Sequence, residues 1–388
     1  MEQTLFRYRC SECDAVFQLD PALMVCPRCA VSQRATEPLR GILEVERCDP
    51  PGELPPDWDS IDLLPVERRW FPSIPVGNTP LWRPERLRAK TSFPYLYLKD
   101  ESANPTGSLK DRASFLVAAW ARQNGIDRIV LASTGNAGSS MAGVGAAAGL
   151  HVRLYLPAAA PEAKLVQAQL YGADLVRVDG TYDTAYDQSL AYVREHGGLS
   201  RNTAYNPMTI EGKKTVSIEI VRQLGRVPDV VFVSAGDGVI LSGVYRGFED
   251  LVRFGVIDRV PLVVAVQAAG SCAIHRARLA GTFEEPVASD TIADSISVDV
   301  PRGGWFALRR LQRHNGTTVV VDDRDILIAQ QELARTAGLF SEPAGAAAYA
   351  GFLRMRDEID PGCRVVLLLT GHGLKDVRAA AKGLQDHG

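Results

Sequence analysis

Short apolar segments alternate with longer stretches of helical spacing along most of this chain. Eight segments rich in β-branched residues are predicted as strands, at residues 95–99, 128–133, 152–156, 175–178, 230–234, 262–267, 317–321 and 364–370. Apolar residues at helical spacing separate most of them, as at residues 161–170 and 326–337. This alternation predicts an α/β fold with parallel-rich sheets that are covered by helices on both faces. The 388 residues are enough for two or three domains.

Two Cys-x2-Cys pairs near the N-terminus predict a small domain of their own. The pairs are Cys10 with Cys13 and Cys26 with Cys29, and twelve residues lie between them. Each pair can turn two thiolates toward one tetrahedral ion, so we expect a zinc ribbon over residues 1–48 with a structural zinc. Four cysteine ligands leave no coordination position open for catalysis. The alternative is a degenerate ribbon, or free thiols with no metal. The proline-rich stretch 49–56 is expected to link the ribbon to the main body.

Charge and hydropathy argue against two classes of partner. The net charge is −3 and both signs are spread along the chain, so no basic stripe is present for nucleic acid or anionic lipid. The longest apolar runs, such as residues 129–132 and 365–369, are far too short to cross a bilayer. Cysteines grouped at metal-ligand spacing are typical of a reducing compartment, so we expect a cytoplasmic protein.

Four loops that follow predicted strands carry the candidate chemistry, because ligands bind at the carboxyl ends of parallel strands. They lie at residues 104–111, 133–139, 234–243 and 370–376. In the first, Lys110 precedes an apolar helix predicted over residues 113–120. Partial desolvation there would favour the neutral amine, which is the form that makes a Schiff base. A solvated surface lysine is the alternative.

Two of these loops are predicted to bind anions through backbone N–H groups. Residues 133–138 open a helix of small residues, and Ser133, Thr134, Gly135 and Asn136 offer N–H groups and polar side chains to a substrate carboxylate. The alternative is an ordinary helix cap. In residues 234–243 the glycines would let main-chain N–H groups close around a phosphate. Asp237 is expected to point away, since its carboxylate would repel that phosphate.

In this order, the four loops resemble those of the fold-type II enzymes that use pyridoxal 5'-phosphate (PLP), and the threonine synthase family most closely. The matching segments are Asn104-Pro-Thr-Gly-Ser-Leu-Lys110 and Thr370-Gly-His-Gly-Leu-Lys-Asp376, with Gly77-Asn-Thr-Pro-Leu81 and Glu342-Pro-Ala-Gly-Ala346 in addition. The resemblance implies two αβα domains with PLP in the cleft between them. The large domain would take residues 49–112 and 213–388, and the small domain residues 113–212.

The resemblance also implies roles for individual residues. Lys110 would hold PLP as a Schiff base and then act as general base and acid. Thr370 would contact the pyridine nitrogen with a neutral hydroxyl, which does not force protonation of the ring and so favours elimination. Ser133, Thr134, Gly135 and Asn136 would bind the substrate carboxylate. The cofactor would contact Lys110, Asn136, Gly236, Asp237, Gly238, Val239, Ser242 and Thr370.

The implied reaction is that of a threonine synthase, which eliminates phosphate from O-phosphohomoserine and adds water to the β carbon. Two segments depart from that family. Residues 294–303 lack the basic residue expected near their start, and residues 342–346 are nearer to the pattern of serine and threonine dehydratases. The alternative is an ammonia-lyase or a β-replacement enzyme for a serine, threonine or diaminopropionate type of substrate. A paralogue without activity is the third interpretation. Homodimers are common among enzymes of this kind, so a homodimer is an expectation.

Several polar residues near the loops leave two interpretations open. Arg112, Lys213 and Lys214 either contact a substrate phosphate or lie in ordinary surface or helix-pairing positions. Asn206 is either a substrate contact or a turn residue. His372 lies between two glycines and is expected to shape its loop rather than to act as an acid or base.

Overall fold

The computed structural model describes residues 5–48, 54, 57–160 and 162–385, and these form two compact units. Unit 1 takes its described residues from Met1–Gln33, Leu39–Val76 and Lys110–Thr215. Unit 2 takes them from Arg34–Pro38, Gly77–Leu109 and Val216–Gly388. Apart from Leu54, the proline-rich stretch 49–56 lies outside the described residues. The division into residues 1–48, 49–112 with 213–388, and 113–212 stays a prediction.

Unit 1 contains a small antiparallel sheet near the N-terminus. Its strand order is β2-β1-β3, and α1 lies between β2 and β3 in the sequence; the elements are β1 (Phe6–Cys10), β2 (Val16–Gln18), α1 (Pro27–Ala30) and β3 (Leu43–Arg47). Alternate residues of β1 are buried, which is the pattern of a strand with one face on a core. Tyr8 and Val45 belong to the same apolar core as Trp120. The N-terminal segment is therefore part of the core of unit 1.

Unit 1 also contains a four-stranded parallel sheet with the order β8-β7-β6-β9. Its strands are β6 (Arg128–Ala132), β7 (His151–Pro157), β8 (Asp174–Val178) and β9 (Leu199–Ser200). The other elements of this unit are η1 (Ser60–Leu63), η2 (Arg68–Trp70), α3 (Lys110–Gln123), α4 (Asn136–Ala148), α5 (Glu162–Leu170), α6 (Tyr182–His196), α7 (Met208–Glu211) and η4 (Gly212–Lys214). Three of the strands were predicted; β9, with two residues, was not.

Small residues bring α4 close to its neighbours. A Cβ atom on Gly145 would lie 2.4 Å from Cγ2 of Val152, and one on Gly138 would lie 3.1 Å from Cδ2 of Leu154. Helix α4 also packs against α3, the helix that begins with Lys110. The run of small residues therefore reflects close packing of α4 on the sheet and on α3.

Unit 2 is built on a six-stranded sheet with the order β12-β11-β10-β13-β5-β4. All neighbours are parallel except β4 and β5. The strands are β4 (Leu81–Trp82), β5 (Leu96–Asp100), β10 (Val230–Ser234), β11 (Leu262–Ala268), β12 (Thr317–Val321) and β13 (Val365–Leu369). All five parallel strands were predicted. Their almost continuous apolar sequences fit strands that are buried on both faces.

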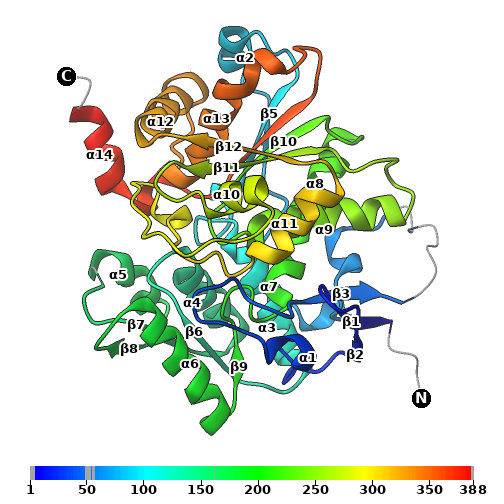
Figure 1. Ribbon diagram of the computed structural model, residues 1–388, viewed down its shortest axis with the longest axis vertical. Coiled ribbons are helices and arrows are strands. Elements are labelled where there is room, and N and C mark those ends of the chain that lie inside the picture. The colour runs from blue at the N-terminus through cyan, green and yellow to red at the C-terminus, as the bar shows by residue number, and fades with distance from the viewer. Residues whose placement is uncertain (1–4, 49–53, 55–56, 161, 386–388) are drawn as a thin grey trace. The chain divides into compact units, whose positions relative to one another are not determined.

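Helices cover the sheet of unit 2. They are α2 (Glu85–Thr91), α8 (Thr215–Leu224), α9 (Val239–Arg253), α10 (Ala273–Ala280), α11 (Gly304–Arg313), α12 (Asp323–Ala337), α13 (Pro343–Met355) and α14 (Val377–Gln385), with short turns η3 (Glu101–Ala103), η5 (Asp294–Ile296), η6 (Arg356–Glu358) and η7 (Gly373–Lys375). The strands run between α12 and α13 on one side and α8 and α9 on the other (Figure 1). The predicted α/β fold with parallel-rich sheets is confirmed. In the described part of the chain, no helix combines the length and the apolar character needed to span a membrane.

A charged cluster joins α9 to α11 in unit 2. The Glu249 carboxylate accepts a hydrogen bond from Nε2 of His314 at 2.8 Å and lies 2.9 Å from both Nε of Arg310 and Nη1 of Arg246. Burial alone would raise the pKa of Glu249, but the His314 hydrogen bond and the two guanidinium charges outweigh it and hold this pKa well below its usual range. Glu249 is therefore ionised in the folded protein across the neutral and mildly acidic range.

We expect Glu249→Gln to lower the free energy of unfolding by about 3 kcal/mol at pH 7, because it leaves buried guanidinium groups without their carboxylate. Since the folded-state pKa is lowered, the contribution is complete above the unfolded pKa of about 4.3 and is lost as the pH falls below it. Urea unfolding at pH 7 and at pH 3 measures the difference. Asp357→Asn, at a side chain that is 93% exposed, is the matched control and should change little. A difference from wild type that persists undiminished at pH 3 would contradict this account.

Candidate active site

The backbone before Lys110 is tied to the loop after β13. The N–H of Leu109 donates to the carbonyl of Thr370 at 2.9 Å, and the N–H of His372 donates to the carbonyl of Gly107 at 2.9 Å. Gly107 has φ +87°, a backbone conformation that glycine adopts without strain. Lys110 follows directly as the first residue of α3 and is half-buried. The chain therefore reaches Lys110 through a short segment whose path is fixed by the Thr370 loop.

A buried ion pair supports the segment at residues 77–81. Nζ of Lys99 lies 2.8 Å from Oε2 of Glu219 and 2.7 Å from the carbonyl of Thr79. The hydroxyl of Thr79 donates to Oε1 of Glu101 at 2.6 Å, and Asn104 also donates to that carboxylate. These contacts connect the Gly77–Leu81 motif to the start of the Lys110 loop. Neither Lys99 nor Glu219 was predicted, because a buried charge has no local sequence signal.

The loop at residues 133–135 joins β6 to α4. The Ser133 hydroxyl accepts hydrogen bonds from the N–H groups of Gly135 at 3.2 Å and Gly138 at 3.0 Å, so it caps the helix. Thr134 and Gly135 are half-buried and Asn136 is buried. A Cβ atom on Gly135 would have nothing within 4 Å. The helix-cap interpretation of Ser133 is thus observed, and open space remains beside Gly135.

The glycine-rich loop joins β10 to α9. Gly238 is the N-cap of α9 with φ +82°, and a Cβ atom on Gly236 would lie 2.7 Å from Cα of Ile296. The Asp237 carboxylate accepts a hydrogen bond from the N–H of Val239 at 2.9 Å, so this side chain is directed toward the backbone of its own loop. The hydroxyl of Ser242 donates to the carbonyl of Gly238 at 2.7 Å. The loop is therefore compact, and only residues without a Cβ fit where it meets Ile296.

Two of the candidate loops of unit 2 have a buried hydroxyl beside them that is not hydrogen-bonded to the described residues. Ser234, the last residue of β10, has a buried Oγ with no hydrogen-bond partner among the described residues, and so has Ser108, two residues before Lys110. Buried hydroxyls are normally hydrogen-bonded. Two orphaned hydroxyls in these loops are what a polar ligand bound nearby would satisfy.

The Thr370 loop contacts a buried carboxylate. Thr370 follows β13 and is buried, and a Cβ atom on the next residue, Gly371, would lie 2.5 Å from Oε1 of Glu342. The Ser295 hydroxyl donates to Oε2 of Glu342 at 3.3 Å. Nδ1 of His372 accepts a hydrogen bond from the N–H of Leu374 at 3.0 Å, so His372 is the N-cap of η7. His372 therefore shapes its loop, as expected.

The predicted residues fall into two groups, one in each unit. In unit 1, Lys110 and Asn136 are the first residues of α3 and α4, which pack against each other. In unit 2, the Gly236–Ser242 loop and Thr370 follow β10 and β13, which are adjacent parallel strands. The loops after β10, β13 and β5, the last of which leads to Lys110, thus lie at one edge of the six-stranded sheet, where ligands of parallel sheets bind. The loop at residues 133–135 follows β6 of the four-stranded sheet.

The polar residues with two open interpretations lie inside unit 1 and form hydrogen bonds there. Nζ of Lys213 donates to the carbonyl of Thr209 at 2.9 Å, and Nζ of Lys214 donates to the carbonyl of Leu63 at 2.7 Å. Arg112 donates to the hydroxyl of Thr215 at 2.9 Å. All three cations are buried, so the surface interpretation is wrong for them. Asn206 accepts a hydrogen bond from the N–H of Met208 within its own turn and donates to the carbonyl of Ser200 in β9, which supports the turn interpretation.

The four N-terminal cysteines come together as their spacing predicts. Their sulfur atoms all lie within 4.8 Å of one another. The backbone N–H of Glu12 donates to Sγ of Cys10 at 3.4 Å, and Gly41, at φ +67°, lies against the second pair. Burial raises the pKa of the Cys10 thiol, whereas a hydrogen bond from the backbone of Ala15 lowers the pKa of Cys13. Four sulfur ligands at this separation form a set that suits a tetrahedral metal ion.

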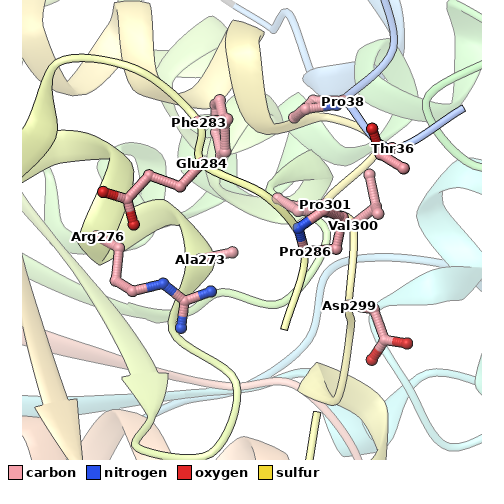
Figure 2. Close-up of a pocket in the computed structure, with 10 residues that line it drawn as sticks. All are labelled: Thr36, Pro38, Ala273, Arg276, Phe283, Glu284, Pro286, Asp299, Val300 and Pro301. Carbon is pink, nitrogen blue, oxygen red and sulfur yellow. The ribbon is translucent and has the colours of Figure 1, made fainter. Parts of the chain in front are cut away.

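Unit 2 also has a small hollow that no motif predicted. It is lined by Thr36, Pro38, Ala273, Arg276, Phe283, Glu284, Pro286, Asp299, Val300 and Pro301 (Figure 2). Three of these residues, Asp299, Val300 and Pro301, belong to the segment 294–303. At the end of this segment, the N–H of Gly303 donates to the carbonyl of Asp237 at 2.7 Å. None of the predicted site residues lines the hollow. It is therefore separate from the candidate active site.

Comparison with known proteins places this arrangement among known enzymes. The family model described as "Pyridoxal-phosphate dependent enzyme" matches residues 73–371. The threonine synthase of Methanosarcina acetivorans is 34% identical over 384 residues, which is 96% of this chain and 93% of that protein. The threonine synthase of Methanocaldococcus jannaschii is 35% identical over 339 residues, covering 85% of this chain and 83% of that protein.

Solved structures show the same fold at lower identity. The processed form of threonine deaminase isoform 2 from Solanum lycopersicum has a TM-score of 0.71 and 21% identity, over 88% of this chain and 99% of that chain. Maize serine racemase has a TM-score of 0.69 and 21% identity, over 80% and 92% of the two chains. The α/β fold is that of the fold-type II PLP enzymes, as the motifs implied. This chain belongs to the family of pyridoxal-phosphate-dependent enzymes that includes the threonine synthases.

Proposed function

We propose that this enzyme is a threonine synthase, a lyase that releases phosphate from O-phosphohomoserine and adds water to give threonine. The observation that carries the proposal is the match to a threonine synthase along 96% of this chain, which extends beyond the 73–371 segment shared with PLP enzymes in general. The Lys110 and Thr370 loops, which bond to each other through the backbone of Leu109, support it.

The chain offers groups that fit PLP, beginning with its phosphate. The proposed contacts are the backbone N–H groups of Gly236, Gly238 and Val239 and the hydroxyl of Ser242, at the start of the fifteen-residue helix α9. The Val239 N–H and the Ser242 hydroxyl would exchange their present bonds, to the Asp237 carboxylate and the Gly238 carbonyl, for bonds to the phosphate. A helix start binds anions because its first N–H groups lack partners within the helix. The Asp237 side chain bonds to Val239, so Asp237 would contribute its backbone only. The orphaned hydroxyl of Ser234 supports a polar ligand beside this loop.

The proposed catalytic residue is Lys110, which would hold PLP as a Schiff base. PLP supplies an electron sink for the bonds of the substrate's α carbon. The Nζ atom of Lys110 would be the base and acid that takes and returns protons at neighbouring carbons of the substrate. The neutral hydroxyl of Thr370 would face the pyridine nitrogen, and Asn136 would bond to the ring hydroxyl. Half-burial of Lys110 supports an amine with restricted water access.

The amino-acid substrate would bind through its carboxylate to residues 133–136. Gly135 has open space beside it, and Asn136 begins a thirteen-residue helix whose N-terminal N–H groups favour an anion. The Ser133 hydroxyl already caps α4, so its proposed role is to hold the shape of the loop while Thr134, Gly135 and Asn136 contact the ligand.

A cytoplasmic location and a homodimer remain parts of the proposal, beside the small-molecule substrate.

A lyase that releases ammonia, or a β-replacement enzyme, is the second candidate, and one contact favours it. Ser295, near the start of the segment where threonine synthases are expected to carry a basic residue, donates to the buried carboxylate of Glu342. A carboxylate is a poor neighbour for a substrate phosphate. The two candidates differ in their products. Purified enzyme supplied with O-phosphohomoserine should release phosphate and threonine in equal amounts; ammonia and a keto acid from serine or threonine, without phosphate release, would favour the second candidate.

The four-cysteine cluster is proposed to hold a structural zinc ion. We expect about one zinc per chain, and we expect Cys26→Ser with Cys29→Ser to abolish binding and to lower the free energy of unfolding by at least about 3 kcal/mol, because metal binding is coupled to folding of the ribbon. Metal analysis after dialysis and urea unfolding measure both effects. Cys48→Ser, at an exposed cysteine outside the cluster, is the control. Wild-type protein that is folded and free of metal would rule out the zinc site.

A further inference from the structure

Two buried polar residues that directly follow β9 contact the elements carrying the candidate catalytic and substrate-binding residues of unit 1. Arg201 is 0% exposed and Asn202 is 1% exposed. Strand β9 is the neighbour of β6 in the sheet, and the N–H of Arg201 extends the pairing by donating to the carbonyl of Val130 at 2.8 Å. Both residues therefore lie beside the end of β6, where the loop 133–135 begins.

Asn202 fixes the end of β6 with its side chain. Its Oδ1 accepts the N–H of Ala132 at 2.8 Å, and its Nδ2 donates to the hydroxyl of Ser189 at 2.8 Å. The Asn202 side chain thus bonds to the edge of β6 beyond the end of β9, where a longer β9 would have paired with it. On the other side of β6, the N–H of Ser133 donates to the carbonyl of Tyr155 at 3.1 Å. The start of the proposed carboxylate loop is therefore held from both neighbouring strands.

Arg201 contacts α3, the helix that begins with Lys110, and through Ser114 of α3 it is linked to α4, the helix that begins with Asn136. Its guanidinium donates to the hydroxyl of Thr203 at 2.8 Å and to the hydroxyl of Ser114 at 3.5 Å. The Ser114 hydroxyl lies 2.7 Å from that of Ser140. Ser114 is four residues after Lys110 in α3, and Ser140 is four residues after Asn136 in α4. This polar contact therefore joins the two helices one turn below their candidate residues.

Burial of these groups needs a reason, because a desolvated guanidinium and amide cost free energy that apolar side chains of the same size do not. The contacts of Asn202 lead to the backbone before Ser133, and those of Arg201 lead to the helices of Lys110 and Asn136. The surrounding core of unit 1 is apolar, including Leu131, Met141 and Leu154. A polar link between these elements fixes direction and spacing, which apolar contacts do less well.

We propose that Arg201 and Asn202 are positioning residues that hold the 133–136 loop at a fixed spacing from Lys110, so that a bound amino acid is aligned with the lysine amine. The inference rests on the proposed roles of Lys110 and of residues 133–136. Neither residue contacts the substrate in this account. A displacement of the loop by about an ångström is enough to weaken binding and alignment strongly.

The test uses the holoenzyme of Asn202→Ala and Arg201→Met, with Arg201→Lys as the conservative variant. The dissociation constant of serine, a probe without phosphate, is measured from the change in cofactor absorbance, and KM and kcat for O-phosphohomoserine are measured beside it. We expect the dissociation constant and KM to rise at least about tenfold in both variants, with the cofactor spectrum retained and Arg201→Lys recovering part of the loss. Leu165→Ala, at a buried residue of α5, controls for general destabilisation.

Unchanged serine affinity in Asn202→Ala and Arg201→Met would overturn the inference, and so would an equal loss in Leu165→Ala. If the two main variants do not fold, Ser140→Ala removes only the hydroxyl pair and should still raise the dissociation constant by about threefold; no change would again overturn it. Weakened serine binding in the variants with no phosphate release by wild type would reject the threonine synthase proposal alone. Phosphate release with unaltered binding would reject the positioning role alone.

Discussion

Lys110→Ala is expected to lower kcat/KM for phosphate release by at least about four orders of magnitude, because the same amine would hold the cofactor and transfer protons, and proton transfer alone contributes about 10²–10⁴-fold. The variant should remain folded, since Lys110 is half-buried at the start of a helix and alanine is a good helix former. Release of phosphate from O-phosphohomoserine measures the effect, and thermal unfolding checks the fold.

Lys382→Ala is the matched control for this prediction, because Lys382 lies on the exposed face of α14. It should leave kcat/KM within about twofold of wild type, as surface substitutions away from a site usually do. A Lys110→Ala enzyme that keeps a tenth or more of the wild-type activity would mean that another group performs the chemistry.

Gly236→Ala is expected to weaken PLP binding by about a hundredfold and to lower the free energy of unfolding by about 2 kcal/mol, the usual cost of overpacking a tight site. The added Cβ atom would lie 2.7 Å from Cα of Ile296 and 3.0 Å from its carbonyl carbon and oxygen. Backbone atoms cannot move aside as a flexible side chain does, so the proposed phosphate loop must shift. Absorbance titration with PLP and urea unfolding measure the two effects.

Gly255→Ala separates this effect from the general cost of replacing a glycine. Gly255 has φ +68°, and a Cβ atom there would have nothing within 4 Å. We expect it to cost about 1 kcal/mol of stability through backbone strain and to leave PLP affinity unchanged. Equal PLP affinity in Gly236→Ala and wild type would mean that the loop at residues 236–242 does not hold the cofactor.

Most of the fold was predictable because fully buried parallel strands have continuous apolar sequences. The predicted strand at residues 230–234 is β10 without change, and the prediction at residues 364–370 differs from β13 by one residue at each end. The two-residue strands β4 and β9 were missed, since so few residues show no periodicity. Packing of the N-terminal sheet into the core of unit 1 brings residues far apart in the sequence, such as Tyr8 and Trp120, into one apolar cluster, which no local pattern encodes.

The candidate site was predicted from the composition of the loops. Composition alone does not show which distant residues hold those loops in place. Glycine-rich and polar loops after strands were visible in the sequence, whereas the partners that fix them were not. Lys99 pairs with Glu219, which is 120 residues away, and Asn202 bonds to the backbone of Ala132, 70 residues away. Polar side chains in such loops also bond to their own backbone, as Ser133 and Asp237 do, so polarity alone does not identify a ligand contact.

The most direct test of the central claim is to reduce the purified protein with borohydride after incubation with PLP and to map the modified peptide. Reduction converts a lysine Schiff base into a stable secondary amine, so the mass of the labelled peptide identifies the lysine. We predict one modification, at Lys110, together with a visible absorbance band that is absent in Lys110→Ala. A modification at another lysine, or no visible band and no modification in the wild-type protein, would contradict the account.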